Sequence, residues 1–135
     1  ILELPKEPFP PLLADRQRLE QVITILLDNA ISYTPAGKEV RLKMYKKEGS
    51  RRISAGYFRT VIEVADTGKG VPDEIKQRIF DRFYRGDASR KDKKHFGLGL
   101  SIAKELTEMH GGTLAVHDNP GGGSRFVVTL TLQQA

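Results

Sequence analysis

The stretch VIEVADTGKG (residues 61–70) joins an apolar run to a carboxylate and a pair of glycines. The run VIEVA is typical of a strand, so Asp66 closes the strand and Gly68 and Gly70 form the turn that follows it. A second glycine pair begins the stretch FGLGLSIAKEL (96–106) and again opens into a helical pattern. Glycine lets backbone come close to a ligand, and the start of a helix attracts anions. Two such turns predict a ligand site between them.

The composition indicates one globular domain. The chain has 135 residues, of which 39% are hydrophobic and 29% charged, and it carries a net charge of +5. This length is enough to bury a core without staples, and the absence of cysteine excludes disulfides and thiolate metal sites. No apolar run is long enough to span a bilayer. Because the chain starts at Ile1 without methionine, we expect residues 1–135 to be one domain cut from a longer protein.

The positive charge is uneven. Residues 84–95, YRGDASRKDKKH, lie between the two glycine turns. A charge run is most often a solvated loop, but a nucleic-acid patch or a lid over a polyphosphate would have the same composition. The position beside both turns favours the lid. The cations of this run are Arg85, Arg90, Lys91, Lys93 and Lys94.

Hydrophobic periodicity predicts an α+β domain with helices on one face of a mixed, mostly antiparallel sheet. Residues 1–14 are Pro-rich and indicate an edge strand or an extended arm. Asp15 is the expected N-cap of the first helix, which ends near 34–37. The remaining expected elements are strands at 39–45 and 57–65, a short helix after Pro72, a long helix at 97–110, and a closing hairpin of 113–118 and 124–132 around the turn 119–123.

Neither glycine pair belongs to a common nucleotide motif. The dinucleotide fingerprint would need glycine at positions 73 and 102, which are Asp73 and Ile102, and no P-loop pattern occurs. On a helical wheel Asn29 lies just outside the apolar arc of the first helix, while Asp28 faces solvent. Asn29 is therefore either an ordinary helix-edge amide or a group that faces a cavity. Asp66 is either the start of an Asx turn or a ligand-binding carboxylate.

Five motifs taken together identify a family. They are LLDNAISYTP (26–35), DTGKG (66–70), IFDRFYR (79–85), FGLGLSIAKELTEMHGG (96–112) and GGGSRFVVTL (121–130). In this order and spacing they resemble the ATP-binding catalytic domain of sensor histidine kinases, within the Bergerat-fold ATPases that include Hsp90-type chaperones, gyrase B and MutL. The resemblance covers about residues 11–132. It implies a two-layer α/β sandwich with ATP between the helices and the sheet, under a lid.

The resemblance also implies roles for individual residues. Asn29 would be catalytic and would coordinate Mg²⁺. Asp66 would accept a hydrogen bond from the adenine amino group, and Arg85 would be the second catalytic residue, reaching the terminal phosphates. Phe80 and Phe83 would anchor the start of the lid. The other residues implied to contact the nucleotide are Tyr33 beside adenine, Gly68, Gly70 and Val71 in the first turn, Gly97, Leu98, Gly99 and Leu100 at the phosphates, and Ser124.

Two positions depart from the family pattern. Ser32 stands where many members have a cation, so we expect phosphate neutralisation to depend on Arg85 and the lysines near it. Ile25 stands where Hsp90-type ATPases have a hydrolytic Glu, so efficient self-contained hydrolysis is not expected. None of His95, His110 and His117 lies in a setting typical of a phosphoacceptor histidine.

The leading hypothesis is the catalytic domain of a two-component sensor histidine kinase, which transfers the γ-phosphoryl of Mg-ATP to a histidine on a separate domain. The implied partners are that phosphoacceptor domain, through which the parent protein would form a homodimer, and a response regulator. The domain would be cytoplasmic, without direct membrane contact, in a parent protein anchored in the membrane. Two alternatives stay open: a nucleotide-binding regulatory module without phosphotransfer, and a nucleic-acid binder. The second lacks a recognition helix with clustered basic and aromatic residues.

Overall fold

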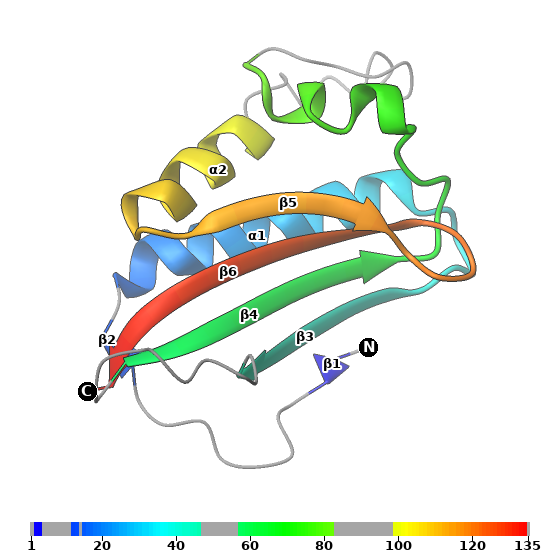
Figure 1. Cartoon of the computed structure of the whole chain (residues 1–135). Coiled ribbons are helices and arrows are strands. Elements are labelled where there is room, and N and C mark those ends of the chain that lie inside the picture. The colour runs from blue at the N-terminus through cyan, green and yellow to red at the C-terminus, as the bar shows by residue number, and fades with distance from the viewer. Residues whose placement is uncertain (1, 4–11, 14, 47–56, 83–98, 135) are drawn as a thin grey trace.

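The computed structural model describes residues 2–3, 12–13, 15–46, 57–82 and 99–134. It confirms an α+β domain in which two helices cover a curved sheet (Figure 1). In chain order the elements are β1 (Leu2–Glu3), β2 (Leu12–Leu13), α1 (Arg16–Tyr33), β3 (Val40–Lys46), β4 (Tyr57–Asp66), the 3-10 turns η1 (Asp73–Ile75) and η2 (Arg78–Phe80), α2 (Gly99–Met109), β5 (Thr113–Asp118) and β6 (Ser124–Gln134).

Within the described residues the sheet has six strands, and its mixed character agrees with the prediction. Its order is β1-β3-β4-β6-β2, and β5 also pairs with β6. The β1–β3 pairing is parallel, and the other pairings between described strands are antiparallel. The Pro-rich N-terminal segment contributes β1 and β2 at the margins of the sheet, which confirms its prediction as edge structure. Strand β6 is central and carries β4 along one side and β5 on the other.

Helix α1 begins where the sequence predicts. The Asp15 carboxylate accepts a hydrogen bond from the backbone N–H of Arg18 at 3.2 Å, which caps the helix. Val22, Leu26 and Ala30 recur every four residues and are almost fully buried. Burying one large aliphatic side chain stabilises a fold by about 1.5–3 kcal/mol, so this stripe fixes which face of α1 meets the sheet.

Alternate residues along the central strands β4 and β6 point toward the helices and form the rest of the core. Phe126, Val128 and Leu130 of β6 and Val64 of β4 are at most 2% exposed, and all pack in one cluster with the buried stripe of α1. Figure 1 shows both helices on the same side of the sheet. Neither described helix is long and apolar enough to cross a bilayer.

The segment after Pro72 differs from the prediction, because it forms the turns η1 and η2 instead of one helix. Two contacts with other parts of the chain hold this segment. Phe80 is buried against Phe126 in an edge-to-face pair with centroids 6.2 Å apart, and the Lys76 ammonium bonds the Asp118 carboxylate at 2.8 Å. So short a segment gains little from helical bonds, and its contacts with the core therefore decide its path. The burial of Phe80 fits its predicted anchoring role, whereas Phe83 lies outside the described residues.

Candidate nucleotide site

The site is built around the end of β4, where Asp66 is 5% exposed. Its carboxylate oxygen Oδ1 accepts hydrogen bonds from the backbone N–H of Gly68 at 3.0 Å and, more weakly, from that of Ser124 at 3.4 Å. Its other oxygen, Oδ2, accepts a bond from the Ser124 hydroxyl at 2.8 Å. A carboxylate offers about four acceptor positions, and three are filled from within the protein. The remaining acceptor position, on Oδ2, has no partner among the described hydrogen bonds.

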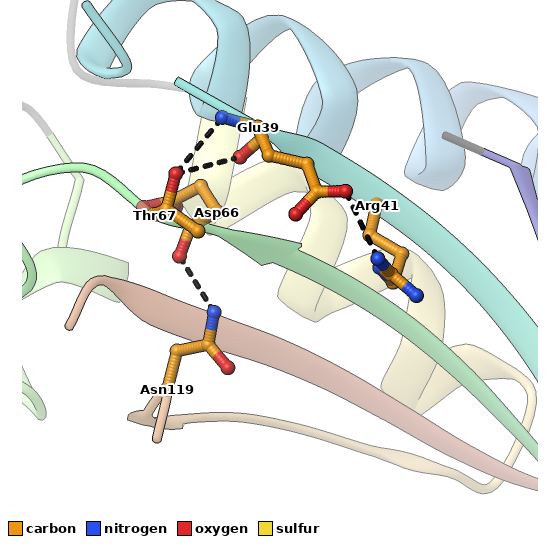
Figure 2. A network of polar contacts seen from close by, with 5 residues as sticks. All are labelled: Glu39, Arg41, Asp66, Thr67 and Asn119. Atoms are coloured by element: carbon orange, nitrogen blue, oxygen red, sulfur yellow. Dashed lines mark hydrogen bonds and ion pairs between the residues drawn. The ribbon is translucent and has the colours of Figure 1, made fainter. Parts of the chain in front are cut away.

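The backbone around Asp66 is held from both sides (Figure 2). On the β3 side, the N–H of Thr67 donates to the Glu39 carbonyl at 3.0 Å, and the Thr67 hydroxyl accepts from the Glu39 N–H at 2.8 Å. On the β6 side, the Asn119 amide donates to the Asp66 carbonyl at 2.8 Å. The Asx-turn interpretation of Asp66 is also correct, because its carboxylate bonds Gly68 two residues on, and it is compatible with ligand binding.

The two glycines of this turn are required by space and conformation. A Cβ atom at Gly68 would lie 2.9 Å from the Tyr33 carbonyl oxygen, so the turn packs directly on the end of α1. Gly70 has a φ of +81°, and a Cβ there would lie 3.2 Å from the Gly123 carbonyl oxygen. The turn after β4 therefore touches both α1 and the β5–β6 turn, and both contacts depend on the absence of a side chain.

Helix α1 brings two predicted residues to the same region. Asn29 is half-buried beside fully buried Ala30, which agrees with its predicted place at the edge of the apolar arc, and Asp28 is exposed. Tyr33, the last residue of α1, is 36% exposed, and its carbonyl borders Gly68. The last turn of α1 thus forms one wall beside the Asp66 carboxylate.

The start of α2 lies against the same helix. A Cβ atom at Gly99 would stand 3.4 Å from Cγ2 of Ile25, which precedes Asn29 by one helical turn. The described first turn of α2 contains no acidic residue, and the N–H groups at the start of a helix favour an anion. Because Ile25 and Asn29 are four residues apart and share a face of α1, the start of α2 lies against the face that carries Asn29.

The structure brings the predicted residues together to different degrees. Asp66, Gly68 and Ser124 are directly hydrogen-bonded. The side chains of Val71 and Leu100 pack against the core. Arg85, Gly97 and Leu98 lie outside the described residues.

Three contributors were missed by the sequence analysis: Asn119, Thr67 and Gly123. Their residue types are ordinary for turns, and their contacts join segments that are distant in the chain. A run of three glycines after Asn119 was the available sign that another backbone approaches closely.

The site has no preformed metal cage in the part of the chain that is described. No group of three or more His, Cys, Asp or Glu side chains there is arranged to hold a metal ion. The half-buried Asn29 amide is a hard oxygen donor that fits Mg²⁺, which in nucleotide sites takes most of its ligands from phosphates and water. The residues present therefore fit a metal that arrives with a nucleotide.

Comparison with known proteins agrees with this geometry. The family model of histidine kinase-, DNA gyrase B- and HSP90-like ATPases matches residues 14–134. The chain belongs to this family of ATP-binding domains.

Similar proteins include histidine kinases. The chain is 40% identical over 129 residues to hybrid signal transduction histidine kinase D of Dictyostelium discoideum, covering 93% of this chain and 8% of that protein. It is 37% identical over 121 residues to sensor histidine kinase YclK of Bacillus subtilis (strain 168), covering 88% and 24%. The crystal structure of full-length ShkA in complex with AMPPNP matches with a TM-score of 0.75 and 32% identity over 96% of this chain and 24% of that one. The chain thus spans a quarter or less of each of these relatives.

Proposed function

We propose that this chain is the ATP-binding catalytic domain of a sensor histidine kinase. The observation that carries the proposal is the buried Asp66 carboxylate at the end of β4. It accepts three hydrogen bonds from Gly68 and Ser124 and keeps one acceptor position of Oδ2 without a described partner. Support comes from the family match over residues 14–134 and from a similar structure that binds AMPPNP.

The proposed specificity follows from the chemistry of Asp66. An ionised carboxylate only accepts hydrogen bonds, so it attracts the exocyclic amine of adenine and repels the carbonyl oxygen that guanine carries at that position. One free acceptor position matches one N–H of the amine. We assign the glycines at 68 and 70 to the base side of the site on the sequence motif; they let the turn pack closely against the Tyr33 and Gly123 carbonyl oxygens beside this carboxylate.

The phosphates would lie between α1 and the start of α2. There the N–H groups of Gly99 and Leu100 favour the anion, and the Asn29 amide oxygen would ligate Mg²⁺. The bound metal would neutralise phosphate charge during transfer. We assign Arg85, Gly97 and Leu98 to the phosphates as well, on the sequence motif alone.

We further propose that the phosphoryl acceptor is a histidine on a separate domain of the parent protein. A neutral imidazole is already a nucleophile, so the transfer needs no strong base. The position four residues before Asn29 holds Ile25, whose side chain packs against the core and cannot activate water. We also expect a homodimer through the acceptor domain, a response regulator that receives the phosphoryl group, and a cytoplasmic location in a membrane-anchored parent.

The test is phosphorylation in trans. The domain is mixed with Mg-ATP and a dimeric phosphoacceptor domain from the same parent protein, and acid-labile, base-stable phosphate on that domain is measured. Phosphohistidine that depends on both components supports a kinase. Tight ATP binding without transfer would instead support the nucleotide-binding regulatory module, and salt-dependent DNA binding without ATP binding would support the nucleic-acid binder.

A further inference from the structure

Asn119 makes two backbone hydrogen bonds that close the turn between β5 and β6. The Asn119 N–H donates to the Gly123 carbonyl at 3.1 Å, and the Asn119 carbonyl accepts from the Gly122 N–H at 2.9 Å. The three glycines of the turn have φ values of +87°, +113° and +101°, which side chains disfavour. Because three consecutive glycines allow many backbone conformations, contacts with other residues are needed to hold this turn in one of them.

The Asn119 side chain provides such a contact across the sheet. The last residue pair of the β4–β6 ladder is Ala65 with Arg125, and beyond it the Asn119 amide donates to the Asp66 carbonyl at 2.8 Å (Figure 2). Gly123 lies close to the same carbonyl, and only glycine fits there, because a Cβ atom would overlap the Asp66 carbonyl oxygen. Asn119 therefore continues the strand pairing at the point where the ladder stops.

This contact controls the surroundings of the Asp66 carboxylate. Ser124 directly follows the turn and supplies two of the three hydrogen bonds to that carboxylate. When Asn119 holds the turn against Asp66, it orients the peptide plane after Asp66, while Ser124 is held by its pairing with Asp118 in the β5–β6 ladder. Loss of the contact would let the carboxylate turn away from its present direction.

The contacts on the other side cannot replace Asn119. Thr67 and Glu39 join the turn to β3. On the β6 side, strand pairing ends at Ala65 with Arg125, and Ser124 bonds the Asp66 carboxylate. Among the described hydrogen bonds, the one to the Asp66 carbonyl comes from Asn119. The contacts with β3 preserve the end of β4 within the sheet. A variant at Asn119 should therefore keep the fold while it loses the alignment of the carboxylate.

From this arrangement we infer that Asn119 is a positioning residue that sets base selectivity by aiming the Asp66 carboxylate at the exocyclic amine of the purine. The inference rests on the proposed function, because it requires Asp66 to contact that amine. It extends the site to a residue that itself touches no nucleotide. The contact needs a donor at Asn119, since a carbonyl oxygen can only accept.

The experiment compares Mg-ATP with the triphosphate of purine riboside, which lacks only the exocyclic amine. Calorimetry on the wild-type domain should show about tenfold or more tighter binding of ATP. Asn119→Asp keeps the side-chain shape but replaces the donor with an acceptor. It should weaken ATP by about tenfold and the analogue by less than about threefold, so that the ratio collapses. Gln17→Glu, which makes the same charge change at an exposed site on α1, should leave both affinities unchanged.

The outcomes are separable. If wild type binds both ligands equally, the proposed contact between Asp66 and adenine is wrong. If wild type discriminates and Asn119→Asp discriminates equally, Asn119 does not set selectivity. Equal weakening of both ligands assigns Asn119 a purely structural role and also overturns the inference. Asn119→Ala removes the donor without adding charge, and should show the same loss of ratio if Asn119→Asp does not fold.

Discussion

Replacement of Asp66 by Asn should remove most ATP affinity and leave the fold largely intact. The amide oxygen can keep the Oδ1 place, where it accepts from the N–H of Gly68 at 3.0 Å. The new NH₂ group then takes the Oδ2 place, where the Ser124 hydroxyl can rotate from donor to acceptor across the present 2.8 Å. Every internal hydrogen bond keeps a donor and an acceptor.

The adenine amine, by contrast, cannot change from donor to acceptor as the Ser124 hydroxyl can. In the proposed site the amine would meet an N–H donor in place of the unfilled acceptor position of Oδ2, and a charge-assisted bond of about 1.5–3 kcal/mol would be lost. At about 1.4 kcal/mol for each tenfold change, ATP should bind roughly 10- to 150-fold more weakly. The cost to the fold is one weakened bond of about 1 kcal/mol, or roughly 3–5 °C in the unfolding midpoint.

Calorimetry with Mg-AMPPNP and thermal unfolding measure the two effects separately. Glu108→Gln removes one carboxylate charge from the exposed end of α2 and serves as the matched control. It should change neither quantity. An Asp66→Asn protein that binds the nucleotide as tightly as wild type would refute the assignment of this carboxylate to adenine. A protein that fails to fold would show instead that the charge is structural.

Three further variants test the rest of the site. Asn29→Ala should abolish the gain in ADP affinity that Mg²⁺ confers, because a metal with few protein ligands loses one; calorimetry with and without Mg²⁺ is the measurement, and full retention of the gain contradicts the role. Arg85→Ala should lower transfer in trans by more than it lowers ATP affinity, since charge on the transferred oxygens is greatest during transfer; equal losses would make Arg85 a binding residue only. Gly68→Ala should lower both the unfolding midpoint and ATP affinity, because its Cβ would lie 2.9 Å from the Tyr33 carbonyl; an unchanged midpoint would mean that the turn relaxes freely.

Much of the fold was predictable because local patterns and tertiary contacts agree. The stripe of Val22, Leu26 and Ala30 and the Asp15 cap define α1 from sequence alone. The segment after Pro72 was predicted wrongly as one helix. Its path is set by the Phe80–Phe126 contact and by Lys76 with Asp118, all of which join distant parts of the chain.

The same distinction applies to the site. Asp66 and the glycines beside it are ordinary turn residues by themselves, and they point to a ligand site only together with the other motifs in their order and spacing. Asn119 does not stand out, because Asn before Pro-Gly is ordinary in turns. Its contact with the Asp66 carbonyl spans 53 positions, and only the pairing of β4 with β6 brings the two together.

A crystal structure of the domain with Mg-AMPPNP would show directly whether Asp66 accepts a hydrogen bond from the exocyclic amine of adenine. The account predicts the exocyclic nitrogen within about 2.7–3.2 Å of a carboxylate oxygen of Asp66, with the Ser124 hydroxyl still bonded to that carboxylate. The triphosphate should run toward Asn29 and the start of α2. A base bound elsewhere, or a base in this site whose amine points away from Asp66, would contradict the account.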